Sequence, residues 1–158
     1  MPIIFARVDD RLIHGQVVQA WLPELNIDEV VIPCSKTQEK RLNKSLLRLS
    51  LPFEYNLTVL EPAQCVRYMD GSPKRILLLL GSLQDLQPLL EDGLHIKSVN
   101  IGGLHFKEGA QKLAENVFLD ETDKNTLKIL NDLGIGIETR AVPSSKSISI
   151  REILHFEI

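Results

Sequence analysis

The stretch Ile76-Leu77-Leu78-Leu79-Leu80 is apolar at every position. A strand with one face in water alternates apolar and polar residues, whereas a strand covered on both faces is apolar throughout. A helix that crosses a bilayer needs about 20 apolar residues, so this run is too short to be a membrane span. We therefore expect residues 76–80 to form a central strand of a parallel sheet, with helices on both sides.

Short apolar or β-branched runs alternate along the chain with segments of helical spacing. The predicted strands are Ile3–Val8, Glu29–Pro33, Asn56–Leu60, Arg75–Leu80, Ser98–Ile101, Asn116–Leu119 and Ile135–Val142. The apolar faces of the predicted helices are Val18, Trp21, Leu22 and Leu25, then Leu42, Leu46 and Leu49, and then Leu86, Leu89 and Leu90. This alternation predicts a three-layer α/β/α fold with a mostly parallel central sheet of six to seven strands. The last predicted strand alternates apolar and polar residues, so we expect it at an edge of the sheet.

Residues that commonly begin and end helices mark several boundaries. Ser82 and Asp85 have the spacing of a capping box, and Pro62 suits the first turn of a helix. Gly93 and Gly134 suit the position just after a helix ends. These signals agree with the helices that the apolar spacing predicts.

Composition and charge exclude several classes of protein. The net charge of −3 over 158 residues provides no broad basic face for nucleic acid. The first residues lack the charged region and cleavage site of a signal peptide, so we expect a cytoplasmic protein. Cys34 and Cys65 belong to no C-x-x-C pair, and we expect two buried thiols rather than zinc or redox chemistry. With no repeat, low-complexity tract or linker, residues 1–158 are expected to form a single domain.

The most unusual segment is the loop after the first predicted strand, Arg7-Val8-Asp9-Asp10-Arg11-Leu12-Ile13-His14-Gly15-Gln16-Val17. Two carboxylates, two guanidinium groups and one imidazole lie close together between a predicted buried strand and a predicted helix. In doubly wound sheets, ligands bind beyond the carboxyl ends of the strands. Backbone N–H groups at a helix start favour an anion there. We therefore expect the functional site in this loop.

His14 is the expected centre of the site. A neutral imidazole is nucleophilic, and an unperturbed histidine is partly neutral at cytoplasmic pH. Arg11 could hold the oxygens of a transferring phosphoryl group through its planar fork. Either Asp9 or Asp10 could bind the other ring nitrogen and fix the tautomer, or could anchor Arg11. Gly15 would allow a close approach or an unusual backbone angle.

Other interpretations of the loop stay open. A histidine near a helix start is often a cap or a surface residue, and Asp-Asp-Arg is often a local ion pair. A metal site made of Asp9, Asp10 and His14 is less favoured, because their spacing matches no recognised ligand pattern.

Three further segments follow predicted strands. Ser82 could donate to phosphoryl oxygens, or could only cap a helix. The run Asn100-Ile101-Gly102-Gly103 could present backbone donors to an anion, or could form a tight turn. His105 could supply a second imidazole, although its neighbours Phe106 and Lys107 favour a surface position.

The stretch Arg7–Val17, with Trp21 one turn further on, resembles the signature of the IIB subunits of the mannose/fructose/sorbose family of the bacterial phosphotransferase system. The resemblance covers nearly the whole chain. Its other landmarks are the apolar strand Ile76–Leu80, the run Ser98-Val99-Asn100-Ile101-Gly102-Gly103-Leu104 followed by Gly109, and the closing strand Ile135–Val142.

This resemblance implies a phosphohistidine carrier, a protein-Npi-phosphohistidine–sugar phosphotransferase. A IIA subunit would phosphorylate His14, at Nδ1 as in the family, and His14 would pass the phosphoryl group to a sugar held by the membrane subunits IIC and IID. The protein would associate peripherally with that transporter, and family members are often homodimers. The implied catalytic residues are His14, Arg11, Asp10 and Asp9, and the implied phosphate-binding residues are Arg11, Gly15, Gln16 and Ser82. No metal, cofactor or nucleic acid is expected.

Two other functions use the same residues. A regulatory phosphoprotein would report carbohydrate supply through phosphorylated His14 without any transport. A phosphate- or nucleotide-binding module would hold its ligand with Arg11 and the glycine loops, and His14 would only cap a helix.

Overall fold

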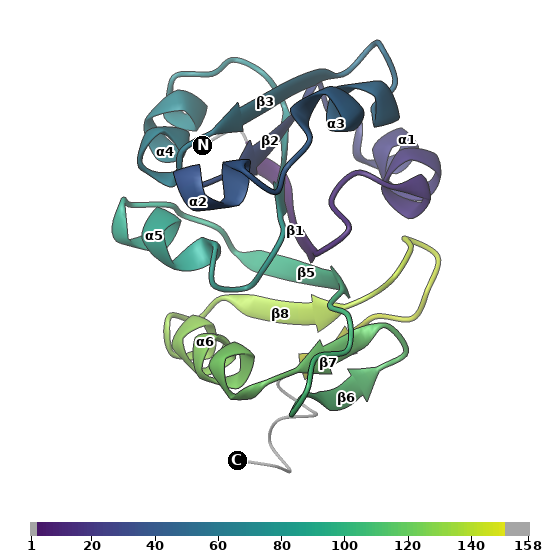
Figure 1. The fold of residues 1–158 in the computed structure, drawn as a ribbon, viewed down its shortest axis with the longest axis vertical. Coiled ribbons are helices and arrows are strands. Elements are labelled where there is room, and N and C mark those ends of the chain that lie inside the picture. The colour runs from purple at the N-terminus through teal and green to yellow at the C-terminus, as the bar shows by residue number, and fades with distance from the viewer. Residues whose placement is uncertain (1–2, 151–158) are drawn as a thin grey trace.

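The structure is a computed structural model that describes residues 3–150. Its centre is a seven-stranded sheet with the strand order β3-β2-β4-β1-β5-β8-β9 (Figure 1). The six longer strands run parallel, and β9 pairs antiparallel with β8. The strands of this sheet are β1 (Ile3–Asp9), β2 (Glu29–Pro33), β3 (Asn56–Leu60), β4 (Ile76–Leu80), β5 (Ser98–Gly103), β8 (Gly136–Thr139) and β9 (Ile148–Ser149).

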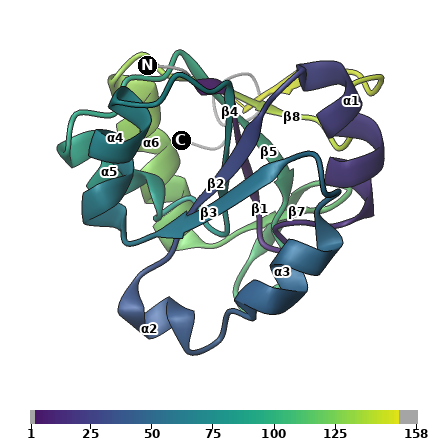
Figure 2. The same cartoon turned by 90° about the horizontal axis from the view of Figure 1, so that it is seen from above.

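Helices cover both faces of the sheet, as Figure 2 shows from above. On one face lie α4 (Pro62–Asp70), α5 (Leu86–Glu91) and α6 (Glu121–Asp132), and on the other lie the π-helical turn η1 (Val17–Trp21), α1 (Leu22–Leu25) and α3 (Lys44–Ser50). The short α2 (Lys36–Glu39) follows β2. No helix of residues 3–150 is long and apolar enough to cross a membrane.

The central strand β4 supplies side chains to both layers. Leu78 and Leu80 pack with α4, α5 and α6, whereas Leu77 and Leu79 pack with η1, α1 and α3. All five residues of β4 are completely buried. The uninterrupted apolar run 76–80 is therefore explained by burial on both faces, and the predicted three-layer fold with a mostly parallel sheet is confirmed.

Two predicted strands lie elsewhere than expected. The strand predicted at Asn116–Leu119 is β7 (Val117–Leu119), which leaves the main sheet and pairs antiparallel with β6 (Gln111–Ala114). A parallel strand needs a long crossover, usually a helix, and the residues between β5 and β7 form none. The strand β8 is not the edge of the sheet, because the two residues of β9 cover it.

The apolar face predicted for the helix at residues 42–49 is wrong at Leu46 and Leu49, although Leu42 packs against the core. Leu46 is 59% exposed and Leu49 is 84% exposed, whereas Leu47 and Leu51 pack into the core. Asn43 caps α3 by accepting a hydrogen bond from the backbone N–H of Leu46, and the helix has only two turns. Leu47 and Leu51 are also four residues apart, so leucine spacing alone permits either face.

The helix-end signals agree with the structure at most positions. Pro62 begins α4, and Gly93 and Gly134 have φ values of 96° and 77° just after α5 and α6. Ser82 accepts a hydrogen bond from the backbone N–H of Asp85 at 3.3 Å, but α5 begins only at Leu86. This pair therefore closes a turn before the helix instead of capping it. The free thiols of Cys34 and Cys65 are both buried, as expected.

Candidate functional site

The loop of residues 10–16 leaves the carboxyl end of β1, near the middle of the sheet. Strands β2, β3 and β4 lie on one side of β1, and β5 and β8 lie on the other, so the strand order reverses here. This is the position at which open parallel sheets bind ligands. Leu12 has a φ of 57°, and its N–H donates to the carbonyl of Asp9, which folds the loop back over the end of β1.

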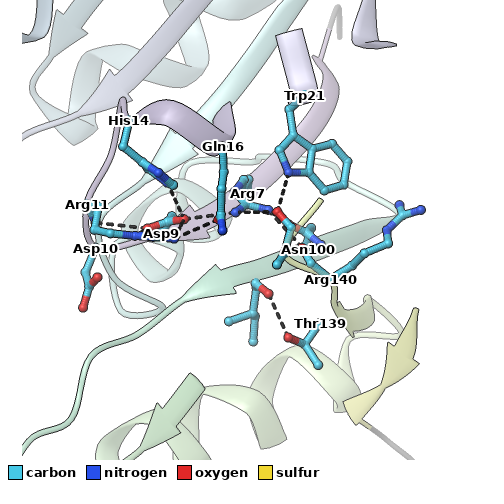
Figure 3. A network of polar contacts seen from close by, with 12 residues as sticks. Arg7, Asp9, Asp10, Arg11, His14, Gln16, Trp21, Asn100, Thr139 and Arg140 are labelled. Carbon is cyan, nitrogen blue, oxygen red and sulfur yellow. Dashed lines mark hydrogen bonds and ion pairs between the residues drawn. The ribbon is translucent and has the colours of Figure 1, made fainter. Parts of the chain in front are cut away.

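The carboxylate of Asp9 is the centre of the polar network in Figure 3. It is completely buried and accepts hydrogen bonds from the side chains of Arg7 (3.0 Å), Arg11 (3.1 Å) and His14 (2.9 Å). The backbone N–H of Arg11 donates to it as well. Burial alone raises the pKa of Asp9, but the hydrogen bonds from His14 and Arg11 outweigh it and hold this pKa well below its usual range. Asp9 is therefore ionised at neutral pH.

His14 presents one ring nitrogen to Asp9. Its Nε2 lies 2.9 Å from Oδ2 of Asp9, and its side chain is 17% exposed. An ionised carboxylate can only accept hydrogen bonds, so Nε2 must be the protonated nitrogen. In the neutral ring Nδ1 then carries the free lone pair, and no described residue is hydrogen-bonded to it.

Arg11 lies at the outer side of the network. Its Nε and Nη2 donate to Asp9, and Nη2 also donates to Oε1 of Gln16 at 3.1 Å. The side chain of Arg11 is 32% exposed, and the described residues leave its Nη1 without a hydrogen-bond partner. The loop thus brings a partly exposed guanidinium and an imidazole onto one buried carboxylate.

Asp10 turns away from His14 (Figure 3). It accepts hydrogen bonds from the backbone N–H of His105 at 2.7 Å and from the ring Nδ1 of His105 at 2.5 Å. Of the two carboxylates considered for His14, the structure therefore places Asp9 against the ring. His105 is 67% exposed, so it lies on the surface and ties its own loop to residues 10–16.

Two other predicted residues lie apart from the network. A Cβ atom at Gly15 would meet no heavy atom within 4 Å, and this glycine does not have the positive φ that was considered for it. Ser82 follows β4 and lines a cavity of about 370 Å³ together with Asp10 and Leu12. Its hydroxyl is hydrogen-bonded to Asp85, so Ser82 borders the loop without a contact to His14.

The paired glycines at the end of β5 have a role that sequence reasoning missed. A Cβ atom at Gly102 would lie 1.9 Å from Cζ of Arg7, and one at Gly103 would lie 3.1 Å from Nη2 of Arg11. Both glycines therefore make room for guanidinium groups, and they end strand β5 instead of forming the tight turn that was the alternative. Their position on β5 is the one sign of this role, because β5 pairs in parallel with β1, the strand that carries Arg7 and Asp9.

Arg7 itself was not predicted as a site residue, although its partner Asp9 was. The guanidinium of Arg7 is completely buried and is hydrogen-bonded to Asn100 and to Asp9. Trp21 lies over it at 5.2 Å and donates from Nε1 to the carbonyl of Ala141. Arg7 stands in the quoted motif two residues before Asp9, but its other hydrogen-bond partners, Asn100 and the carbonyls of Arg140 and Ala141, lie 93 or more residues away, so spacing gives no sign of them.

The side chains considered for a metal site do not converge. His14 and Asp9 meet, whereas Asp10 is bound to His105. In residues 3–150, no group of three or more His, Cys, Asp and Glu side chains could hold a metal ion. The arrangement instead offers an imidazole lone pair beside a cationic side chain, which suits a nucleophile that attacks an anionic group.

Comparisons with known proteins agree with this chemistry. Residues 3–157 match the family model of the PTS system sorbose subfamily IIB component. The chain is 33% identical over 157 residues to the mannose-specific EIIAB component of Escherichia coli K12, and spans about half (49%) of that protein. It is 30% identical over 154 residues to the sorbose-specific EIIB component of Lacticaseibacillus casei, covering 95% of this chain and 93% of the relative.

Solved structures show the same fold. The IIBSor domain of the sorbose permease from Klebsiella pneumoniae superposes with a TM-score of 0.89 at 28% identity, covering 100% of this chain and 99% of that domain. The family model, the sorbose-specific relative and the solved domain each match nearly the full length of this chain, and the solved domain has the same fold. The chain therefore belongs to the sorbose-subfamily IIB components of the sugar phosphotransferase system.

Proposed function

We propose that His14 accepts a phosphoryl group on Nδ1 from a IIA subunit and transfers it to a sugar during uptake through IIC and IID membrane subunits. The observation that carries this proposal is the 2.9 Å contact between Nε2 of His14 and the ionised carboxylate of Asp9. This contact supports a proton on Nε2 of the neutral ring, with Nδ1 as the proposed nucleophile. Family membership agrees with phosphoryl transfer as the reaction.

In the first step, the lone pair of Nδ1 attacks the phosphorus atom of the donor. A bond forms between Nδ1 and phosphorus, and the bond from phosphorus to the donor breaks with its electron pair left on the donor. The imidazole becomes cationic as the bond forms, and the carboxylate of Asp9 stabilises that charge through Nε2–H. In the second step, a sugar hydroxyl attacks phosphorus and its proton passes to water, while the bond from phosphorus to Nδ1 breaks and leaves its electron pair on Nδ1.

Arg11 is the proposed ligand of the phosphoryl oxygens. Its Nε and Nη2 stay on Asp9, while Nη1 is available on a partly exposed side chain. Phosphoryl transfer depends mainly on positioning and on stabilising charge on the equatorial oxygens, which a fixed guanidinium provides. Backbone groups at Gly15 and Gln16, and the hydroxyl of Ser82, are the further proposed phosphate contacts. Asp10 serves the site by holding the loop through His105.

The name of one relative supports the proposed donor. The mannose-specific EIIAB component carries A and B parts in one protein, and this chain matches about half of it, 49%. A IIA subunit is therefore the proposed donor, and the cytoplasmic side of a IIC/IID transporter is the proposed location. The relatives are named for mannose, sorbose, fructose and N-acetylgalactosamine, so the acceptor is proposed at the level of a sugar hydroxyl.

The test is intact-mass spectrometry after incubation with phosphoenolpyruvate, the general phosphotransferase proteins and a IIA subunit. The wild type, His14→Ala and His95→Ala would be compared at alkaline pH, because phosphohistidine is labile in acid. His95 is an exposed histidine away from the loop and serves as the matched control. We expect one phosphate on the wild type and on His95→Ala, and none on His14→Ala.

Two outcomes would count against the proposal. Equal phosphorylation of His14→Ala would place the acceptor elsewhere, and no phosphorylation of the wild type would favour a phosphate-binding module. A regulatory role would appear as a phosphorylated protein whose deletion leaves sugar uptake unchanged.

A further inference from the structure

We infer that Arg7 is a positioning residue for phosphoryl transfer: its buried guanidinium orients the Asp9 carboxylate and so selects the ring nitrogen of His14 that reacts. This inference rests on the proposed function of His14 and extends it to a residue that does not reach the phosphate. It also extends the site to the chain segments that hold Arg7, which lie on β5 and just after β8.

Arg7 is fixed by four oxygen atoms from three parts of the chain. Its Nη1 donates to Oδ1 of Asn100 at 2.6 Å and to the carbonyl of Arg140 at 3.1 Å. Its Nη2 donates to Oδ2 of Asp9 at 3.0 Å and to the carbonyl of Ala141 at 3.2 Å. A planar guanidinium held at both terminal nitrogens has a single orientation, which fixes the direction from which it meets Asp9.

Arg7 and His14 converge on the same atom. Oδ2 of Asp9 lies 3.0 Å from Nη2 of Arg7 and 2.9 Å from Nε2 of His14. Nη2 of Arg11 also donates to Oδ2 at 3.1 Å, so a rotation of the carboxylate would break the contacts to Arg7, His14 and Arg11 together. Arg7 therefore holds Oδ2 at the place where it receives the proton of Nε2, and this contact keeps Nδ1 unprotonated.

Arg7 and Arg11 have different environments and so different tasks. The side chain of Arg7 is completely buried, whereas that of Arg11 is 32% exposed. An incoming phosphoryl group can reach Arg11 but cannot reach Arg7 behind Asp9. Arg7 thus acts on the reaction only through Asp9.

Burying the guanidinium of Arg7 carries a desolvation penalty, so the burial itself is weak evidence for a stabilising role. Its Nε is buried without a hydrogen-bond partner among the described residues, and burial lowers the pKa of Arg7. Apolar residues of similar volume often replace buried ion pairs without loss of stability. The chain nevertheless keeps a glycine at position 102, where any side chain would collide with the guanidinium. A buried charge that contributes little to stability and sits directly behind Asp9 agrees with a positioning role.

The test compares Arg7→Lys, Arg7→Met and Arg11→Ala by two measurements. The first is the ¹⁵N spectrum of the His14 ring in the unphosphorylated protein at alkaline pH, which reports the tautomer. The second is the rate of phosphoryl acceptance from a IIA subunit. Circular dichroism and amide spectra establish that each variant is folded.

We expect wild-type His14 to be almost entirely the Nε2–H tautomer. Arg7→Met should give a mixture of tautomers and accept phosphate about 10- to 100-fold more slowly, on the scale of other orienting groups one step removed from a reacting centre. Arg7→Lys keeps the positive charge but lacks the two terminal nitrogens of the guanidinium. Its share of the Nε2–H tautomer and its rate of phosphate acceptance should therefore lie between those of Arg7→Met and the wild type. Arg11→Ala should be slow as well but should keep the Nε2–H tautomer, because Arg7 still orients Asp9.

A folded Arg7→Met variant with the wild-type tautomer and rate would overturn the inference. If neither Arg7 variant folds, Asn100→Ala decides, because it leaves Arg7 in place and removes the 2.6 Å anchor on Nη1, together with the hydrogen bonds from Asn100 to Glu138 and to the carbonyl of Arg140. We expect a smaller change of tautomer in the same direction, and an unchanged tautomer would reject the role of Arg7. A tautomer shift in a protein whose wild type never takes up phosphate would support the positioning role while rejecting the proposed function.

Discussion

Gly102 leaves the space that the guanidinium of Arg7 fills. A Cβ atom at position 102 would lie 1.9 Å from Cζ and 2.0 Å from Nη2 of Arg7, distances that no neighbouring side chain tolerates. The two residues stand on paired strands, β5 and β1, so neither can move without disturbing the centre of the sheet. The site therefore depends on an absent side chain as much as on the charged ones.

The substitution Gly102→Ala should destabilise the protein. Overpacking a tight position typically costs about 1–3 kcal/mol, and here a fixed guanidinium must move as well. Gly15→Ala is the matched control, because a Cβ at Gly15 meets nothing within 4 Å. Urea unfolding should give a lower midpoint for Gly102→Ala only, and equal midpoints would contradict the contact.

The substitution Asp9→Asn should destabilise the protein at neutral pH by about 3–5 kcal/mol, because it leaves the buried charge of Arg7 uncompensated. The folded-state pKa of Asp9 lies below its unfolded value. Ionised Asp9 therefore contributes its full stability above the unfolded pKa of about 3.9, and this contribution is lost as pH falls through the lower folded pKa. The difference in free energy of unfolding between the wild type and Asp9→Asn should therefore become smaller below about pH 4. Unfolding curves at pH 7 and pH 3 measure this difference, and a difference that grows in acid would refute the assignment.

The substitution Arg11→Ala should slow phosphoryl acceptance by His14 about 10²-fold, the usual scale for losing one donor to a developing charge. The fold should change little, because Arg11 is partly exposed and Asp9 keeps Arg7 and His14 as partners. Arg67→Ala, which removes an exposed arginine from α4 in the opposite layer, is the control. Single-turnover rates from a IIA donor decide the point, and an unchanged rate would remove Arg11 from the site.

Two leucines on α3 should respond in opposite ways to truncation. Leu47→Ala should cost about 2–5 kcal/mol, because Leu47 packs into the core beside η1 and α1. Leu49→Ala should change stability by less than about 0.5 kcal/mol, because Leu49 is 84% exposed. Thermal unfolding of both variants tests which face of α3 is buried, and similar losses would show that the helix is oriented differently.

The sheet could be predicted because its signal is local. Five leucine and isoleucine residues in a row require burial on both faces, and only a sheet between two helical layers provides that. The face of α3 could not be predicted, because the leucines near residues 42–51 fit two helical faces equally well. The two-residue strand β9 gave no pattern, since its pairing with β8 depends on backbone groups alone.

The site also has a part that could be predicted from local sequence and a part that could not. His14, Arg11 and Asp9 lie within six residues, so their grouping was visible in the sequence. The choice between Asp9 and Asp10 was not visible, because it depends on the turn at Leu12 and on His105, which lies 95 residues from Asp10. The role of Arg7 was hidden for the same reason, since its anchors lie 93 and 133 residues away.

The turn after β8 holds the site through main-chain atoms. The carbonyl of Ala141 accepts hydrogen bonds from both Arg7 and Trp21, and the carbonyl of Arg140 accepts one from Arg7. Every residue type supplies a carbonyl, so selection acts there on the path of the chain and hardly on the side chain at position 141. We therefore expect this position to vary in sequence among relatives while its backbone stays in place. A comparison of sequences alone would therefore not identify residues 140–141 as part of the site, although their carbonyls hold Arg7 and Trp21.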